Sequence, residues 1–402
     1  MAEQKYSIAL WHRYGPAAHS EEYPCLPDLI TELAKNYKVH YFGMKTNQPV
    51  PPVIETACKV HFLPFYVNRA SMRDKTWKTI LWYLAIPWMA LYCRFHKITA
   101  LFIDESLPFS FFFIRLFYGR NIARTLTDFF LDIYLGKSKT GMFIAKMLNN
   151  IEIMSWKSLP IIITRVQYTK NFLISKGFQP DRIKVIYNPC NLNLYKPTEK
   201  NASRRKYSIP DNAVVLVHHG VLHPNKANDR ILRVIAEIKE TVPQIHYLLI
   251  GSGPELLTLK RLAAELNIQD RVTFTGWLPT EEEVVEAINA ADMGLVMRKG
   301  LESDNYHVTN TLVHEMACGL PIIAAKLAGV AEIITDGING ILFNPTDMNE
   351  FKEKLIKLAG DRTLRTQLGK MSRETAVKCF DKTKIALDTA SALREHCLER
   401  KK

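Results

Sequence analysis

The sequence is poor in cysteine and has no pattern typical of a structural metal site. Seven cysteines stand singly among 402 residues, without a CxxC pair or the Cys–His spacing of a zinc site. They are Cys25, Cys58, Cys93, Cys190, Cys318, Cys379 and Cys397. This scatter excludes the class of small disulfide-stapled domains. We expect reduced, mostly buried thiols in a cytoplasmic compartment.

The chain also lacks an apolar run long enough to span a membrane. Its longest uncharged run, Thr79–Cys93, is interrupted by Pro87 and is shorter than the roughly 20 residues that a spanning helix needs. The N-terminus has no basic-then-apolar targeting segment and leads directly into an apolar strand. We therefore expect a cytoplasmic protein without a membrane-spanning helix.

Acidic residues are outnumbered, with 53 basic against 40 acidic side chains and a net charge of +13. Such an excess favours an anionic partner, namely phosphates, nucleic acid or an acidic membrane face. No nucleic-acid-binding module is present. Nucleotide phosphates and an anionic membrane surface on the inner face are the partners that remain, and we expect no nucleic acid.

Two segments are rich in aromatic residues and flanked by basic ones. The first is Thr79–Cys93 and the second is Leu107–Arg120. The basic residues around the first are Arg73, Lys75, Lys78, Arg94 and Lys97. One interpretation is peripheral membrane contact through an aromatic, basic surface. The other is a pair of core helices in an α/β domain. The sequence leaves both open.

Short apolar runs alternate with helical stretches along the whole chain, which predicts parallel sheets with helices on both faces. The predicted strands of the first half are Tyr6–Trp11, Lys38–Gly43, Cys58–Pro64, Ala100–Asp104, Asn121–Leu126, Leu159–Thr164 and Ile183–Tyr187. Those of the second half are Ala213–His218, His246–Ile250, Val272–Thr275, Met293–Met297 and residues 321–325. Helical residues 347–359 and 363–398 close the chain.

We therefore predict an α/β fold of two tandem Rossmann-like, doubly wound domains that face a cleft. The turn-rich stretch 188–197 and the basic segment after it mark the linker. The predicted domains are residues 1–197 on the acceptor side and residues 198–374 on the nucleotide side. Residues 375–402 form a C-terminal helix that packs back on the first domain.

The stretch 305–343 is the most informative part of the sequence. It reads as a loop, a helix that carries Glu315, a glycine turn, a buried strand, a second acid at Glu332 and a DGxNG turn. A helix N-terminus at the ends of parallel strands is an anion site, because its first N–H groups lack partners within the helix. A carboxylate one turn further along suits a ribose diol. The combination predicts a site for a nucleoside diphosphate.

Several segments together resemble a known family. They are GVLHPNK (220–226), LLIGSGPE (248–255), RVTFTGWLPTEE (271–282), ADMGLV (291–296) and HEMACGLPIIA (314–324), with weaker matches in TLTDFF (125–130) and VIYNPCN (185–191). The chain resembles the retaining glycosyltransferases of family 4, which use nucleotide sugars and have the GT-B fold. The resemblance implies sugar transfer from a UDP- or GDP-sugar to a saccharide or lipid-linked saccharide acceptor, in surface polysaccharide or glycoconjugate synthesis, with no cofactor.

The resemblance also implies roles for individual residues. Lys226 matches the lysine on the donor diphosphate, and Glu315 matches the acid on the nucleotide ribose. Asn310, Thr311 and Leu312 fall where helix N-terminal amides face the diphosphate. Gly220, Gly251 and Gly253 lie in turns beside the donor. Asp128 stands where an acceptor hydroxyl or the reacting sugar is oriented, although it also suits an N-cap.

Three positions depart from the family pattern. His307 stands where the family's first acid lies, Thr127 where many members have His, and Val221 where many have Arg. His307, and with it His219 or His223, is a candidate substitute at the reacting sugar. The alternative is a catalytically reduced binding subunit that assists a partner glycosyltransferase; a sugar-nucleotide epimerase is a third. The chain has no Asp-x-Asp pair, which fits transfer without a metal ion.

Overall fold

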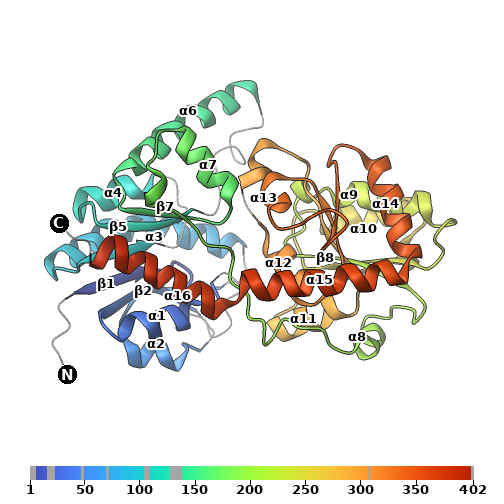
Figure 1. Cartoon of the computed structure of the whole chain (residues 1–402), viewed down its shortest axis with the longest axis horizontal. Helices are drawn as coiled ribbons and strands as arrows, with labels where there is room; N and C mark the ends of the chain where they lie inside the picture. Colours follow the sequence, from blue (N-terminus) through green and yellow to red (C-terminus); the bar gives the residue numbers. More distant parts are fainter. Residues whose placement is uncertain are drawn as a thin grey trace. The chain divides into compact units, whose positions relative to one another are not determined.

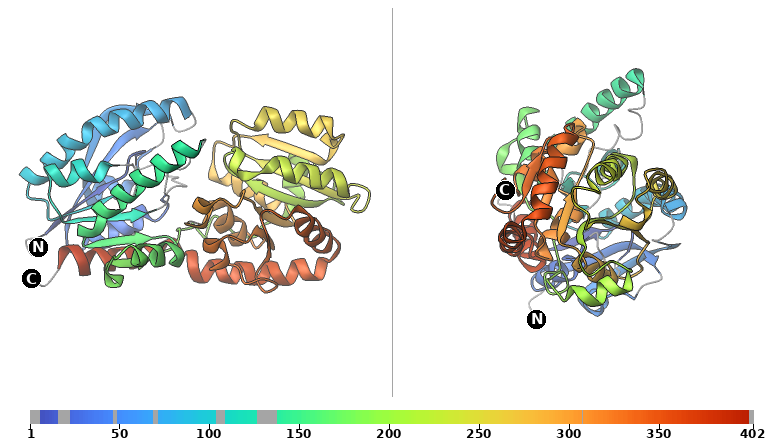
Figure 2. Two further views of the ribbon diagram at one scale, coloured as in Figure 1. Left: turned by 90° about the horizontal axis from the view of Figure 1, so that it is seen from above. Right: turned by 90° about the vertical axis from the view of Figure 1, so that its right-hand side faces the viewer.

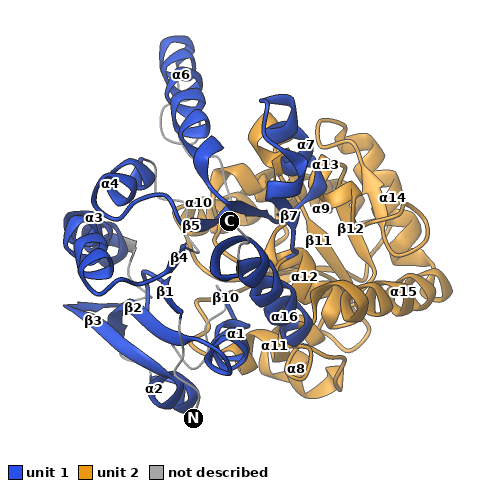
Figure 3. Ribbon diagram, turned by 60° about the vertical axis from the view of Figure 1, so that its left-hand side comes forward, with its two compact units in different colours: residues 1–187, 382–402 blue, residues 188–381 orange. Residues whose placement is uncertain are grey.

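The computed structural model describes residues 6–15, 23–46, 49–68, 72–103, 109–126, 138–306 and 308–399. The chain forms two compact units (Figure 3). Unit 1 comprises Met1–Tyr187 and Lys382–Lys402, and unit 2 comprises Asn188–Asp381. The structure thus divides the chain at 187/188 and 381/382, whereas the sequence suggested 197/198 and 374/375.

Unit 1 contains a seven-stranded parallel sheet in the order β3-β2-β1-β4-β5-β6-β7. Its strands are β1 Ser7–Trp11, β2 Lys38–Thr46, β3 Cys58–Val67, β4 Ala100–Ile103, β5 Ile122–Leu126, β6 Ile161–Thr164 and β7 Ile183–Val185. Its helices are α1 Leu26–Ala34, α2 Pro52–Ala57, α3 Met72–Phe95, α4 Ser110–Phe117, α6 Lys139–Ser155, α7 Gln167–Ser175 and α16 Lys382–Leu393. Side chains alternate along β1, so that Ala9 and Trp11 enter one core and Ile8 and Leu10 enter the other.

These two cores cover opposite faces of the sheet. The first takes buried side chains from α3, α4 and α6, and the second takes them from α1 and α16. Helix α16 lies against α1 within unit 1, although about 350 residues separate them along the chain (Figure 1). The Arg394 side chain, just after α16, donates a 2.6 Å hydrogen bond to Glu32 of α1 and strengthens this contact.

Unit 2 contains a six-stranded parallel sheet in the order β10-β9-β8-β11-β12-β13. Its strands are β8 Val214–His219, β9 Ile245–Ile250, β10 Val272–Gly276, β11 Met293–Val296, β12 Ile322–Ala325 and β13 Ile341–Phe343. Its helices are α8 Lys200–Lys206, α9 Asn228–Ile238, α10 Leu256–Glu265, α11 Glu281–Asn289, α12 Asn310–Ala317, α13 Ala328–Ala331, α14 Met348–Gly360 and α15 Arg362–Phe380. Figure 2 shows helices on both sides of each sheet.

The predicted fold class of two Rossmann-like α/β units is confirmed. Both sheets are parallel, and in both the first strand of the unit lies in the middle and neighbours the fourth. The strand order therefore reverses between β1 and β4 and between β8 and β11. In open α/β sheets, ligands bind at such a reversal, beyond the carboxyl ends of the strands. In unit 2 this rule predicts a ligand site at the segments that follow His219, the end of β8, and Val296, the end of β11.

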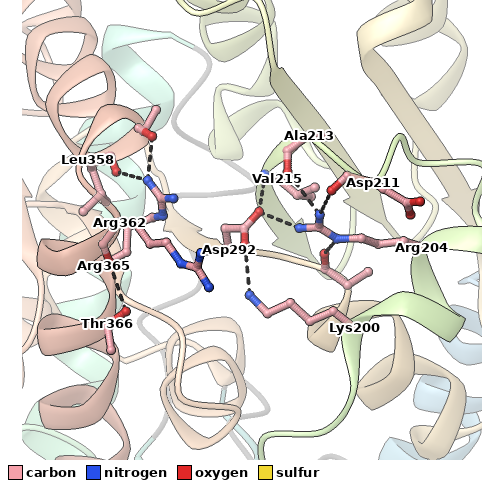
Figure 4. A network of polar contacts seen from close by, with 12 residues as sticks. Lys200, Arg204, Asp211, Ala213, Val215, Asp292, Leu358, Arg362, Arg365 and Thr366 are labelled. Carbon is pink, nitrogen blue, oxygen red and sulfur yellow. Dashed lines mark hydrogen bonds and ion pairs between the residues drawn. The ribbon is translucent and has the colours of Figure 1, made fainter.

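At the amino ends of the unit 2 strands, an acidic side chain forms ion pairs with two basic ones (Figure 4). Asp292, which precedes β11, accepts hydrogen bonds from Lys200 at 3.0 Å, Arg204 at 2.6 Å and the Val215 amide at 2.8 Å. Burial alone raises the pKa of Asp292, but its two basic partners and this amide outweigh burial and lower it. The basic segment that the sequence suggested as a linker is therefore part of unit 2, where Arg204 is buried.

The helix expected over 363–398 is in fact broken. Helix α15 ends at Phe380, Asp381 has φ −57° and ψ 121°, and α16 begins at Lys382. The Phe380 carbonyl accepts a 2.7 Å hydrogen bond from the Cys190 amide instead of continuing the helix. The strand-like pairing of residues 190 and 381 could not be seen in local periodicity, which is helical on both sides of the break.

Candidate active site

The loop after β8 lies at the point where the unit 2 strand order reverses. The strand ends at the buried His219, and Gly220 follows with φ +123°, a value that favours glycine. The His219 carbonyl accepts a 2.9 Å hydrogen bond from the Thr311 hydroxyl in α12. This bond places the start of α12 directly beside the loop. Binding of an anion there stays a prediction.

Gly251 and Gly253 permit two loops to pack against each other. A Cβ atom on Gly253 would lie 2.5 Å from the Leu222 carbonyl oxygen, and one on Gly251 would lie 2.1 Å from the Gly220 carbonyl oxygen. The Leu222 amide donates to the Ser252 carbonyl at 3.0 Å, which links the two loops. The immediate need for glycine here is this close backbone approach. Contact of the two glycines with a donor stays a prediction.

Lys226 lies at the end of a short 3-10 turn, Pro224–Lys226, that follows the Gly220 loop. Its amide donates to the His223 carbonyl at 2.9 Å, and the next residue, Ala227, has φ +50°. The Lys226 side chain is half-buried. Burial lowers the pKa of His219 and raises that of Glu315, and the positive charge of Lys226 adds to the first shift and opposes the second. The lysine charge therefore acts at the carboxyl end of β8. Its predicted contact with a diphosphate stays a prediction.

The first turn of α12 is only partly available to an anion. Thr309 caps the helix, and its hydroxyl accepts the Leu312 amide at 3.3 Å. The Leu312 amide thus has a partner in this arrangement, unlike the expectation for a phosphate donor. Asn310 accepts a 3.0 Å hydrogen bond from Asn188, whose side chain also donates to the Val308 carbonyl at 2.9 Å.

Asn188, which hydrogen-bonds to the start of α12, was not predicted from the sequence. It belongs to the weakly matching segment 185–191, but that segment gave no reason to place its amide at the helix start. The second missed support is Asp304, a buried residue of the loop before α12. Asp304 accepts hydrogen bonds from Arg298 at 3.1 Å and from the Leu301 amide at 2.9 Å, and so shapes the loop.

Glu315 lies beneath the helix start and not at an open surface. Its side chain is 0% exposed. The Glu315 carboxylate lies 3.3 Å from Nδ1 of His219, and Nε2 of His219 lies 3.2 Å from Nδ1 of His314. His314 in turn stacks on Tyr195 with ring centroids 3.9 Å apart. A ribose diol reaches this carboxylate only if the atoms above it move. The predicted ribose contact therefore stays a prediction.

Burial sets the protonation of this group. It raises the pKa of Glu315 well above its ordinary value, against the opposing charge of Lys226. Burial lowers the pKa of His219 to about 3 and lowers that of His314 well below the usual value. Both imidazoles are therefore neutral near pH 7. The distances fit a chain in which His314 donates from Nδ1 to Nε2 of His219 and His219 donates from Nδ1 to Oε1 of Glu315.

Of the three departures from the family pattern, His307 and Thr127 lie outside the described residues, and so does the candidate Asp128. Val221 is 45% exposed and presents an apolar side chain where the family pattern has a cation. Of the candidate substitutes, the His219 ring is buried against Glu315, as described above.

The remaining candidate substitute, His223, is exposed, and its side chain forms a hydrogen bond within its own turn. Its Nδ1 accepts the Asn225 amide at 3.4 Å and so caps the 3-10 turn that carries Lys226. Among the described residues, no group of three or more His, Cys, Asp or Glu side chains converges as metal ligands do.

Residues 199–375 match the family model described as "Glycosyl transferases group 1". This match covers nearly all of unit 2 and confirms, for this part of the chain, the glycosyltransferase resemblance inferred from the sequence. The fold of the whole chain is that of GT-B glycosyltransferases. A structure of HepE from Anabaena in complex with UDP superimposes with a TM-score of 0.69 at 19% identity, covering 96% of this chain and 99% of that one.

Two curated relatives align with about half of the chain. N-acetyl-alpha-D-glucosaminyl L-malate synthase of Bacillus anthracis is 28% identical, over 50% of this chain and 51% of the relative. GDP-mannose-dependent alpha-(1-6)-phosphatidylinositol monomannoside mannosyltransferase of Mycolicibacterium smegmatis is 27% identical, over 45% of this chain and 47% of the relative. The chain thus spans about half the length of the curated relatives that it matches.

Proposed function

We propose that this chain is a glycosyltransferase that moves a sugar from a nucleoside diphosphate sugar to a hydroxyl of a saccharide or lipid-linked saccharide, with retention of the anomeric configuration and without a metal ion. The observation that carries the proposal is the arrangement at the carboxyl edge of the unit 2 sheet. There the Thr311–His219 hydrogen bond joins the start of α12 to the residue before the Gly220 loop, and the charge of Lys226 acts on the same His219.

The proposed chemistry needs a cation where the leaving group forms. The bond between the anomeric carbon and the oxygen of the terminal phosphate breaks, the acceptor oxygen bonds to the same carbon, and the acceptor's proton passes to the departing diphosphate. Negative charge then accumulates on the departing diphosphate. Lys226 is a cation at this end of the strands, and the dipole of α12 adds partial positive charge at its start.

The named ligands of relatives support a nucleotide donor and a lipid-linked acceptor. The Anabaena structure contains UDP, and the mycobacterial relative is named for GDP-mannose and a phosphatidylinositol acceptor. We therefore propose UDP- or GDP-sugars as donors and a lipid-linked glycan as acceptor, in the synthesis of a surface polysaccharide or glycoconjugate.

A panel of UDP- and GDP-sugars tests this proposal. We expect at least one to bind in titration calorimetry, to release its nucleotide slowly by hydrolysis, and to be equally active with and without a chelator. The anomeric configuration of a transferred sugar, read by NMR, tests retention. Absence of binding and of hydrolysis with every donor would refute the proposal.

The proposed ribose contact of Glu315 has its own test. UDP or GDP and its 2′,3′-dideoxy analogue are compared on the unchanged protein and on Glu315→Gln. If the carboxylate takes the diol, removing the diol weakens binding to the unchanged protein but has little further effect on the variant. An equal loss of affinity in both proteins would show that Glu315 acts only from beneath the site.

A binding subunit without turnover is the second candidate, and Val221 favours it, since an exposed apolar side chain replaces a cation of the family pattern. Such a subunit binds the donor but neither hydrolyses nor transfers it. A single-turnover assay with protein in excess over radiolabelled donor separates the two candidates, because a slow enzyme still converts the donor completely.

A further inference from the structure

Helix α3 is apolar on two opposite faces. Its inward face contributes Trp82, Ile86 and Met89 to the core of unit 1. Its outward face carries large apolar residues at helical spacing, namely Trp77, Ile80, Leu84, Trp88 and Phe95, which are 58%, 47%, 72%, 55% and 78% exposed. The stripe runs along roughly 27 Å of helix at about 1.5 Å per residue. A surface helix of a globular domain ordinarily keeps its outward face polar.

Helices α4 and α6 continue this apolar surface. Their exposed apolar residues are Phe112, Phe113 and Leu116 on α4, and Met142, Phe143, Ile144, Met147, Ile151 and Met154 on α6. Of the 23 large exposed apolar side chains in the described part of the chain, 14 lie on α3, α4 and α6. Such a concentration marks an interaction surface, since scattered single residues need no explanation.

All three helices cover the same face of the seven-stranded sheet, because their buried residues belong to one core. Their outward faces therefore point away from the same side of unit 1. Helix α6 stands out from the rest of the unit (Figure 3). It is fastened near its C-terminal end by Glu152, which accepts hydrogen bonds from Arg124 at 3.1 Å and from the Trp156 indole at 3.1 Å. The apolar residues nearer its start remain exposed.

The charge on these helices is mostly positive. Together they carry seven basic residues, Arg73, Lys75, Lys78, Arg94, Arg115, Lys139 and Lys146, and two acidic ones, Asp74 and Glu152. Glu152 is buried against Arg124, so it adds no negative charge to the surface. Asp74 accepts the Asn68 amide at 2.7 Å. Basic side chains beside aromatic and aliphatic ones fit an anionic lipid surface.

We propose that the outward face of α3, α4 and α6, here named the apolar face of unit 1, docks on an anionic phospholipid bilayer without crossing it. Within the described residues no helix is long and apolar enough to cross a membrane. The occupant is a lipid surface and not a second copy of the chain, because a two-fold contact would bring this basic face against its own positive charges. The inference is independent of the proposed transfer chemistry.

Vesicle binding tests the inference. The full chain is sedimented with vesicles of phosphatidylcholine alone or with about 30% phosphatidylglycerol. We expect binding to the anionic vesicles at least tenfold stronger, and weaker again when the salt concentration rises above about 0.1 M. The double variant Leu84→Glu and Phe143→Glu should lose at least tenfold in affinity for these vesicles. Both side chains are largely exposed, at 72% and 70%, so the fold should persist.

A matched control adds the same charge elsewhere. Leu257 in unit 2 is 70% exposed, and Leu387 lies on α16, on the other face of the unit 1 sheet, at 47% exposure. The variant Leu257→Glu and Leu387→Glu should change vesicle affinity less than twofold. Absence of vesicle binding, an equal loss in both variants, or self-association in solution that Leu84→Glu abolishes would overturn the inference. Donor binding without vesicles is measured on the same variants, so a failure of the proposed transfer activity is seen separately.

Discussion

At the scale of single residues, Glu315 shows most clearly what the sequence could and could not predict. It is the residue that the sequence singled out most strongly, and in the structure it is buried beneath α12 against His219. The sequence predicted correctly that Glu315 lies on a helix, because that depends on local order along the chain. Its pairing with His219 joins residues that are far apart in sequence, and no local pattern carries such a contact.

Replacing Glu315 by Gln tests the protonation of this buried group. The pKa of Glu315 is raised in the folded state, so the folded protein holds this proton more tightly than the unfolded chain. The free energy of unfolding of the unchanged protein therefore falls, through this group, as pH rises from about 4.5 toward the folded pKa. Glutamine has no proton to lose and can still accept from His219.

We therefore expect Glu315→Gln to become relatively more stable than the unchanged protein as pH rises, measured by thermal unfolding between pH 5 and pH 8. Glu315→Ala is the control, because it loses the hydrogen bond and leaves a cavity, at a cost of about 2–5 kcal/mol. A stability deficit of the glutamine variant that grows with pH would contradict the raised pKa.

At the scale of elements, the parallel strands were predictable and several helices were not. Strands such as β8 and β9 are buried along their whole length, so they read as short apolar runs between turn residues. Helix α6 was missed because its exposed face is as apolar as its buried one, which removes the amphipathic period. Strand β13 was read as part of a turn, since it has only three residues after the DGxNG sequence.

The loops that follow β8 and β9 pack so closely that we expect an added methyl group at Gly253 to be destabilising. Gly253→Ala should lower the free energy of unfolding by about 1–3 kcal/mol, because its Cβ meets the Leu222 backbone, and should weaken donor binding by shifting the Gly220 loop. Gly360→Ala is the matched control, since nothing lies within 4 Å of its Cβ in α14. That change should leave stability equal or raise it by up to about 1 kcal/mol. Equal unfolding curves for both variants would refute the close-packing argument.

At the scale of the whole molecule, buried histidines predict sensitivity to acid. Burial lowers the pKa of His218 and His219 to about 3 and that of His246 to about 4. Their folded pKa values lie below the ordinary one, so stability is present above about pH 6.5 and is lost as pH falls. Below pH 6.5, each of these histidines lowers the free energy of unfolding by about 1.4 kcal/mol per pH unit. The three together lower it by on the order of 6 kcal/mol at pH 5.

We expect the free energy of unfolding to drop steeply between pH 7 and pH 5 in denaturant titrations. His246→Gln should reduce this slope by roughly a sixth, because it removes one of six described histidines whose pKa burial lowers. The glutamine amide can still donate to Thr273. The same exchange at the exposed His223, His223→Gln, is the control for the substitution itself. A free energy of unfolding that stays constant over this range would contradict neutral burial of these rings.

The two-unit architecture itself was predictable, because two series of alternating strands and helices follow each other along the chain. The points of division were not. The stretch 188–197 looks like a linker by composition, but Asn188 is bound to the start of α12 and Cys190 to Phe380. The composition of a segment indicates where turns lie. Which unit the segment belongs to depends on hydrogen bonds between residues far apart in sequence, such as these.

The most direct test of the account is the donor turnover of Lys226→Ala beside that of Lys357→Ala. Lys357 is an exposed lysine near the end of α14, away from the site. With the nucleotide sugar that the unchanged protein uses, we expect Lys226→Ala to lower the rate of transfer or hydrolysis by about 10²–10³-fold at unchanged thermal stability, and Lys357→Ala to retain the full rate. Turnover of Lys226→Ala within a factor of about two of the unchanged protein would contradict the assignment of the diphosphate site to the carboxyl edge of unit 2.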